Sequence, residues 1–107
     1  DPAIRDRVLS EVGSSDPVTI GQAAAAVARF DSTAWASDID VPTSVVLTER
    51  DRLVPASNQR AMADRIRGAV VHSVPGDHSV CVTRPAIFVP ALADACISVV
   101  RRAGESP

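Results

Sequence analysis

The chain of 107 residues contains no lysine and no tyrosine, and aromatic residues make up only 3% of it. Its net charge of −2 provides no basic surface of the kind that binds nucleic acid or an anionic membrane. No apolar run approaches the ~20 residues that are needed to span a bilayer. We therefore expect no nucleic-acid partner and no membrane span.

Cysteine is also scarce, and the two that are present, Cys81 and Cys96, lack the spacing of metal ligands. We expect both to be buried thiols of a protein in the reducing cytoplasm, and a disulfide between them is the alternative. We expect no metal site and no cofactor.

The hydrophobic fraction of 46% is enough for one small core, built mainly from Val, Ile, Leu and Ala. All eleven basic residues are arginine, and a usage rich in Ala and Arg is typical of a GC-rich genome. The chain begins at Asp1, and its only methionine is Met62. We expect it to be the C-terminal piece of a longer polypeptide, with a trimmed natural N-terminus as the alternative.

Apolar periodicity and turn residues predict an alternation of helices and short strands. The first two helices have apolar stripes, and the second contains a run of alanines that favours helix. The two strands are short, rich in valine and nearly continuous in apolar character, as is typical of strands covered on both faces. The expected elements are helices over 3–12 and 18–30, a strand over 43–48, a helix over 54–66, a strand over 69–74 and a final helix over 86–102.

From residue 42 onward the order is strand, helix, strand, helix, which predicts a βαβ unit with parallel strands. A parallel sheet of two strands is not stable by itself. We therefore expect further strands, from the same polypeptide or from another chain. A small free-standing α/β module is the alternative.

Asp51 lies about three residues beyond the first strand, and His78 lies about four residues beyond the second. Sites in parallel sheets form beyond the carboxyl ends of the strands. Neighbouring strands are roughly 4.8 Å apart, so Asp51 is expected to accept a hydrogen bond from one imidazole nitrogen of His78. Such a pair makes up two members of a hydrolytic triad, with His78 as general base. The third member is missing, because no G-x-S-x-G motif occurs in the chain.

Each of these residues also has a structural interpretation. An Asp before a helix often caps it, and Gly76-Asp77-His78 is compatible with a simple turn. Asp77 is either a surface acid or a second partner for the ring. His72 lies within a strand, where a structural role is expected.

A specific resemblance adds to these observations. The stretch Asp40-Val41-Pro42-Thr43-Ser44-Val45-Val46-Leu47-Thr48-Glu49-Arg50-Asp51-Arg52-Leu53-Val54-Pro55 resembles the seventh-strand region of the α/β-hydrolase family, which carries the triad acid. Residues 69–78 resemble its eighth strand and histidine loop, residues 84–102 its final helix, and residues 3–30 the last helices of its lid. Two positions depart from the family pattern: Thr48 and Asp77 stand where glycine is usual.

The resemblance implies a partial α/β-hydrolase fold with two parallel strands and flanking helices, preceded by two lid-type helices, with the rest of the sheet missing. It divides the chain into residues 1–38, the end of the lid, and residues 39–107, the C-terminal part of the core. It implies Asp51 as the acid and His78 as the base in hydrolysis of an ester-type bond.

The nucleophile, serine or aspartate, would come from the remaining N-terminal part of the hydrolase, in the same or a separate chain. The substrate would be a small ester, and we expect this chain alone to be inactive. The competing hypothesis is a non-catalytic interaction module that completes another chain's sheet.

Overall fold

A computed structural model describes residues 1–105 of the chain. They form two compact units, which divide between Asp31 and Ser32. The first unit contains the helices α1 (Pro2–Ser14) and α2 (Pro17–Arg29). Each helix begins with a proline after an aspartate whose side chain accepts a backbone N–H, which is a favourable helix start. Neither helix has a buried residue.

The second unit is the mixed α/β fold that was predicted from the sequence. Its strands β1 (Ser44–Thr48) and β2 (Val70–Val74) pair in parallel, with Ser44 opposite Val70 and Thr48 opposite Val74. The remaining elements are the 3-10 helix η1 (Ala36–Asp38) and the helices α3 (Ala56–Arg65), α4 (Val80–Thr83) and α5 (Pro85–Gly104).

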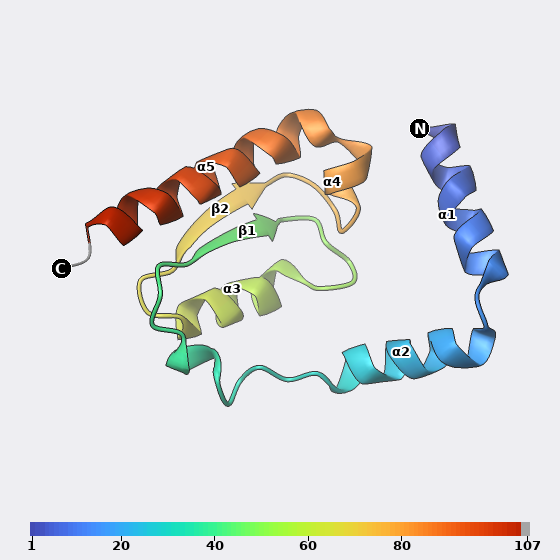
Figure 1. The fold of residues 1–107 in the computed structure, drawn as a ribbon, viewed down its shortest axis with the longest axis horizontal. Helices are drawn as coiled ribbons and strands as arrows, with labels where there is room; N and C mark the ends of the chain where they lie inside the picture. Colours follow the sequence, from blue (N-terminus) through green and yellow to red (C-terminus); the bar gives the residue numbers. More distant parts are fainter. Residues whose placement is uncertain (106–107) are drawn as a thin grey trace. The chain divides into compact units, whose positions relative to one another are not determined.

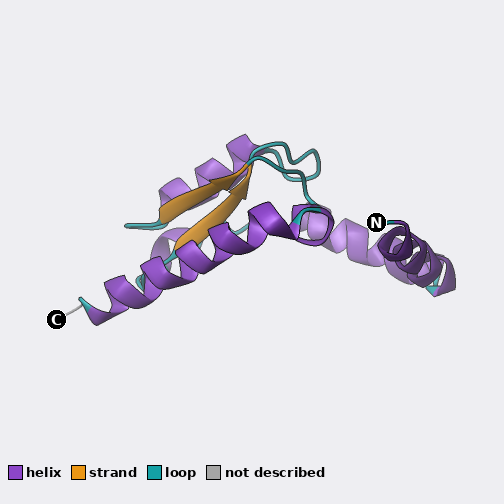
Figure 2. Cartoon of the chain, turned by 90° about the horizontal axis from the view of Figure 1, so that it is seen from above, coloured by secondary structure: helices purple, strands orange, loops and turns teal. Residues whose placement is uncertain are grey.

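Helices lie on both faces of the sheet, but β2 is covered less fully than β1, with Val70 and Val71 36% and 37% exposed. Helix α5 packs on β1 and β2, while α3 contacts β1, and the strands lie between the two helices in Figures 1 and 2. Leu47, Val74 and Val80 are the largest side chains that are fully buried in this core. The expected helix over 86–102 is present and continues through Pro90.

Arg102 ties the end of α5 to the amino ends of the strands. Its guanidinium donates hydrogen bonds to the carbonyl oxygens of Gly68 and Thr43, both at 3.0 Å, and to Ser44 Oγ at 2.7 Å. Bonds from a charged donor are stronger than neutral ones. This contact therefore fixes α5 along the strands whose opposite ends carry the candidate site.

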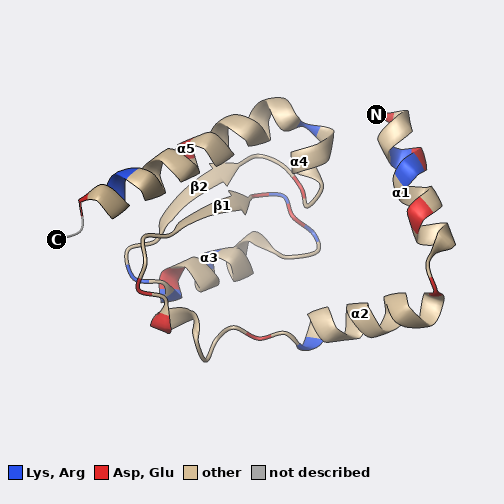
Figure 3. Cartoon of the chain, viewed as in Figure 1, with Lys and Arg blue, Asp and Glu red and all other residues tan. Residues whose placement is uncertain are grey.

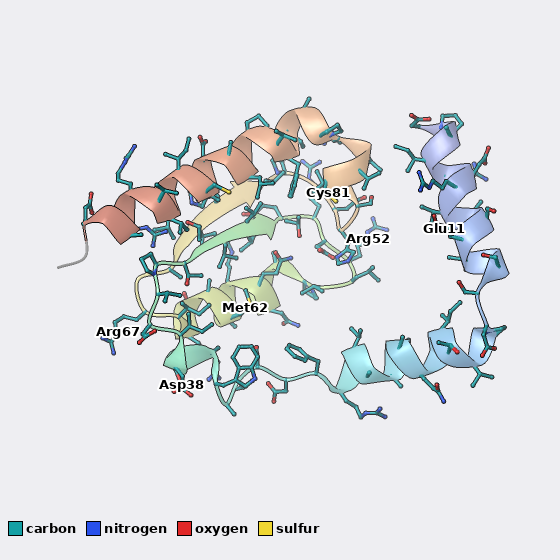
Figure 4. The ribbon with its side chains drawn as sticks, viewed as in Figure 1. Glu11, Asp38, Arg52, Met62, Arg67 and Cys81 are labelled. Atoms are coloured by element: carbon teal, nitrogen blue, oxygen red, sulfur yellow. The ribbon has the colours of Figure 1, made fainter. Side chains whose placement is uncertain are left out.

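The burial expected for the two cysteines differs from the structure. Cys81 and Cys96 are free thiols, as expected, but both are exposed rather than buried. Their neighbours Val80 and Ala95 take the buried positions on α4 and α5, so the cysteines lie on the outer side of each helix. Figure 4 shows the position of Cys81.

The compact units divide between Asp31 and Ser32, while the division at residue 38 into lid and core stays a prediction. Ala36 in η1 is 1% exposed, and η1 contacts α3, so this segment packs with the α/β unit. In the described part of the chain, no helix combines the length and the apolar character required to cross a membrane.

Candidate functional site

The two loops that carry Asp51 and His78 leave the sheet side by side. Pairing between the strands continues past their ends, since the Glu49 N–H donates to the Val74 carbonyl and the Arg50 N–H to the Gly76 carbonyl, both at 3.0 Å. Thr48 and Val74 are aligned in register. Residues three or four positions beyond them are therefore brought to the same edge of the sheet.

Asp51 and His78 meet at this edge, as the sequence predicted. His78 Nδ1 lies 2.9 Å from Asp51 Oδ2. An ionised carboxylate only accepts hydrogen bonds, so Nδ1 carries the proton that is shared with it. Within the described residues Nε2 has no hydrogen-bond partner, and the His78 side chain is 56% exposed. The ring is held at one nitrogen and open at the other.

The carboxylate of Asp51 is the most strongly held group at the site. Its side chain is 3% exposed. Oδ1 accepts the backbone N–H groups of Leu53 and Val54 at 2.9 and 2.8 Å, while Oδ2 accepts Thr48 Oγ1–H and His78 Nδ1–H, each at 2.9 Å. Burial opposes ionisation, but these four bonds outweigh it and hold the pKa of Asp51 well below its usual 3.8. The group is therefore an anion beside the imidazole at neutral pH.

A second layer of polar contacts holds Asp51 from behind. The Gln59 side chain, on α3, donates from Nε2 to Thr48 Oγ1 at 2.9 Å, and its Oε1 accepts the Thr48 N–H at 3.0 Å. Nε2 also donates to the Val54 carbonyl at 2.7 Å. With Gln59 donating to it, the Thr48 hydroxyl directs its own proton to Asp51. The role of Gln59 at the site was not predicted from the sequence. The only sign of it in the sequence is a polar side chain on the helix that follows the Asp51 loop.

Asp77 does not bind the imidazole. Its Oδ1 accepts the Ser79 N–H at 2.9 Å and Ser79 Oγ–H at 2.7 Å. The hydroxyl of Ser79, and then its amide, lower the pKa of the Asp77 carboxyl, while the charge of Asp51 acts in the opposite direction. Of the two roles considered for Asp77, the structure agrees with the surface acid, whose side chain bonds to the backbone and hydroxyl of Ser79 in its own turn.

The His78 loop folds tightly over a buried side chain. Gly76 is buried, and a Cβ atom at this position would lie only 2.7 Å from Val80 Cβ. No side chain fits there without displacing Val80, which is 2% exposed. The glycine thus permits the close approach that sets where His78 lies relative to β1.

His72, the other histidine, lies away from this edge of the sheet. Its Nε2 is 3.3 Å from Ser44 Oγ, the same oxygen that accepts from Arg102. Ser44 is opposite Val70, at the amino end of the strands. This agrees with the structural role expected for His72. In residues 1–105 no three His, Cys, Asp or Glu side chains are grouped so that they could hold a metal ion.

The lowered pKa of Asp51 has a consequence for stability against pH. A carboxyl whose pKa is lower in the folded than in the unfolded state stabilises the fold above its unfolded pKa of 3.8. That stability is lost as pH falls below 3.8 towards the folded pKa. We expect the urea midpoint of the wild-type chain to exceed that of Asp51→Asn at pH 6, and the difference to shrink steadily from pH 4 to pH 2. A difference that is constant over this range would show that the carboxylate charge does not stabilise the fold.

Comparison of the chain with protein-family models, with curated proteins and with solved structures gives no match. The functional argument therefore rests on the chemistry of the residues described above.

Proposed function

We propose that the chain is the C-terminal part of an α/β-hydrolase, in which Asp51 and His78 serve as the acid and the base of a catalytic triad for ester hydrolysis. The observation that carries the proposal is the bond between Asp51 Oδ2 and His78 Nδ1, at 2.9 Å, with His78 Nε2 left open. The position of the pair beyond the carboxyl ends of parallel strands supports it, because active sites of parallel α/β sheets form there.

The described groups have the properties that such a base requires. A buried, ionised Asp51 fixes the Nδ1–H tautomer and leaves the Nε2 lone pair to accept a proton. It also stabilises the imidazolium that forms during the reaction.

In the proposed reaction a serine hydroxyl from outside this chain attacks the ester carbonyl carbon, and its proton passes to His78 Nε2. The imidazolium then returns this proton to the departing alkoxide, which leaves as an alcohol. Water repeats the sequence on the acyl-enzyme, giving the free acid and restoring the serine. With an aspartate nucleophile the substrate would instead be an epoxide or a carbon–halogen compound. The carboxylate would attack the carbon and open the epoxide or displace the halide, and water activated by His78 would hydrolyse the resulting ester intermediate.

The decisive experiment uses the polypeptide that contains residues 1–107 in the cell, expressed in full beside the 107-residue chain. We expect the full polypeptide to hydrolyse p-nitrophenyl acetate and to be labelled on a serine by a fluorophosphonate, and the 107-residue chain to do neither. Turnover by the 107-residue chain that the fluorophosphonate inhibits would contradict the proposal.

A full polypeptide without esterase activity and without labelling would also contradict it. That result would favour the hypothesis of a non-catalytic module. Under that hypothesis, we expect the chain to co-purify with a separate protein, and the chain would add its two strands to the sheet of that protein.

A further inference from the structure

We propose that the cleft beside His78 binds the negatively charged group of an ester substrate, a carboxylate or a phosphate. The cleft has a volume of about 550 Å³. Three arginines, Arg50, Arg52 and Arg84, line it together with His78. That the bound molecule is an ester rests on the proposed function, whereas binding of an anion in the cleft does not depend on it.

The charge of the cleft is opposite to that of the whole chain. The net charge of the chain is −2, yet the cleft is lined by three arginines and a single carboxylate, Asp77. Asp51, the other nearby anion, is 3% exposed and holds four hydrogen bonds. In Figure 3 positive and negative segments alternate on the loop that follows β1, and the acids there are already engaged, Glu49 with Arg60 and Asp51 with His78. An anion that enters the cleft therefore meets an excess of positive charge.

These positive charges are not neutralised by neighbouring side chains. The ion pairs of Arg7 with Glu11, Arg60 with Glu49 and His78 with Asp51 include no arginine of the cleft. The carboxylate of Asp77 accepts from Ser79 instead. Unpaired guanidinium groups are well suited to the oxygens of a carboxylate or a phosphate, which they bind through paired N–H donors.

The arginines come from both sides of the cleft. Arg50 and Arg52 lie on the loop after β1, where Figure 4 labels Arg52, and Arg84 lies between α4 and α5. Arg84 Nη1 donates to the Pro75 carbonyl at 3.4 Å, and the Arg50 N–H donates to the Gly76 carbonyl. These contacts join the arginine loops to the loop that carries His78, so the arginines and the imidazole line the same cleft.

The size and lining of the cleft indicate a small substrate. Its volume of about 550 Å³ is typical of small-molecule sites, and Leu53, Pro75 and Val80 supply apolar contacts beside the charged groups. The fitting substrate is a short ester with a carboxylate or a phosphate at the end remote from the bond that is cleaved.

The test is binding, measured at pH 8 by ¹H–¹⁵N NMR on the full polypeptide that contains residues 1–107. Monomethyl succinate and methyl phosphate carry the charged group, and dimethyl succinate is the neutral control. We expect the charged probes to shift the amide signals of residues 76–80 and the neutral diester to leave them unchanged. Which charged probe binds more tightly separates a carboxylate substrate from a phosphate substrate.

Arg52→Gln should weaken binding of the charged probes about tenfold, because charge-assisted hydrogen bonds to the anion are lost. Arg52 takes part in none of the ion pairs named above, so we expect its replacement to leave the fold intact. Arg67→Gln, an exposed arginine just before β2, is the matched control and should not change binding. Binding should also weaken with added NaCl.

Equal binding of the neutral diester, or unchanged binding in Arg52→Gln, would overturn the anion site. Anion binding by a full polypeptide that lacks esterase activity would uphold the site and reject the hydrolase. Esterase activity without any preference for charged esters would uphold the hydrolase and reject the anion site.

Discussion

Replacing Asp51 with asparagine in the full polypeptide is expected to lower kcat on ester substrates by about 10⁴-fold. The change preserves the shape of the side chain but removes the charge that His78 Nδ1 contacts at 2.9 Å. An asparagine amide presents N–H donors to the ring, which favours the tautomer with the proton on Nε2. The nitrogen that should accept the nucleophile's proton is then already protonated.

The same substitution has a readout that does not depend on activity. In the wild-type chain ¹⁵N NMR of the His78 ring, recorded at a pH where the ring is neutral, should show the Nδ1–H tautomer, and in Asp51→Asn it should show loss of this tautomer. Asp77→Asn is the matched control, because Asp77 bonds Ser79 and not the imidazole. Wild-type kcat in Asp51→Asn, or equal losses in both variants, would remove Asp51 from the proposed triad.

Replacing Leu47 with alanine should destabilise the fold by about 2–5 kcal/mol, the usual cost of such a change in a packed core. Leu47 is 0% exposed and lies on β1, which both α3 and α5 contact. Truncation leaves a cavity that rigid strands fill only in part. Urea unfolding of the chain, followed by far-UV circular dichroism, measures the loss.

Leu53→Ala removes the same atoms from a side chain that is 75% exposed. It should change the free energy of unfolding by no more than about 0.5 kcal/mol. Comparable losses in the two variants would mean that Leu47 is not at the centre of the packing.

The α/β unit was largely predictable because its elements depend on local signals. Valine-rich runs and turn residues predicted both strands within a residue of their observed ends, and their order along the chain predicted the parallel pairing. The contact between Asp51 and His78 followed from the same information, because residues beyond the carboxyl ends of neighbouring parallel strands share one edge.

The features that the sequence did not predict depend on which side of a helix packs inward. The spacing of Cys81 and Cys96 gave no sign that Val80 and Ala95 would take the buried positions next to them. Likewise, Gln59 supports Asp51 only if one particular side of α3 faces β1. The apolar periodicity of the sequence does not define that side to within one residue.

The side chain of Gln59 also limits how the sheet can grow. On β1 the backbone groups of Thr43 and Glu49 bond to β2, so those of Ser44, Val46 and Thr48 point to the opposite, open edge. At Thr48 the amide of Gln59 already fills that edge, donating and accepting as a third strand would. A strand added beside β1 can therefore pair only as far as Val46 and must diverge before it reaches Asp51. This divergence would leave the edge of the enlarged sheet next to the acid without a paired strand.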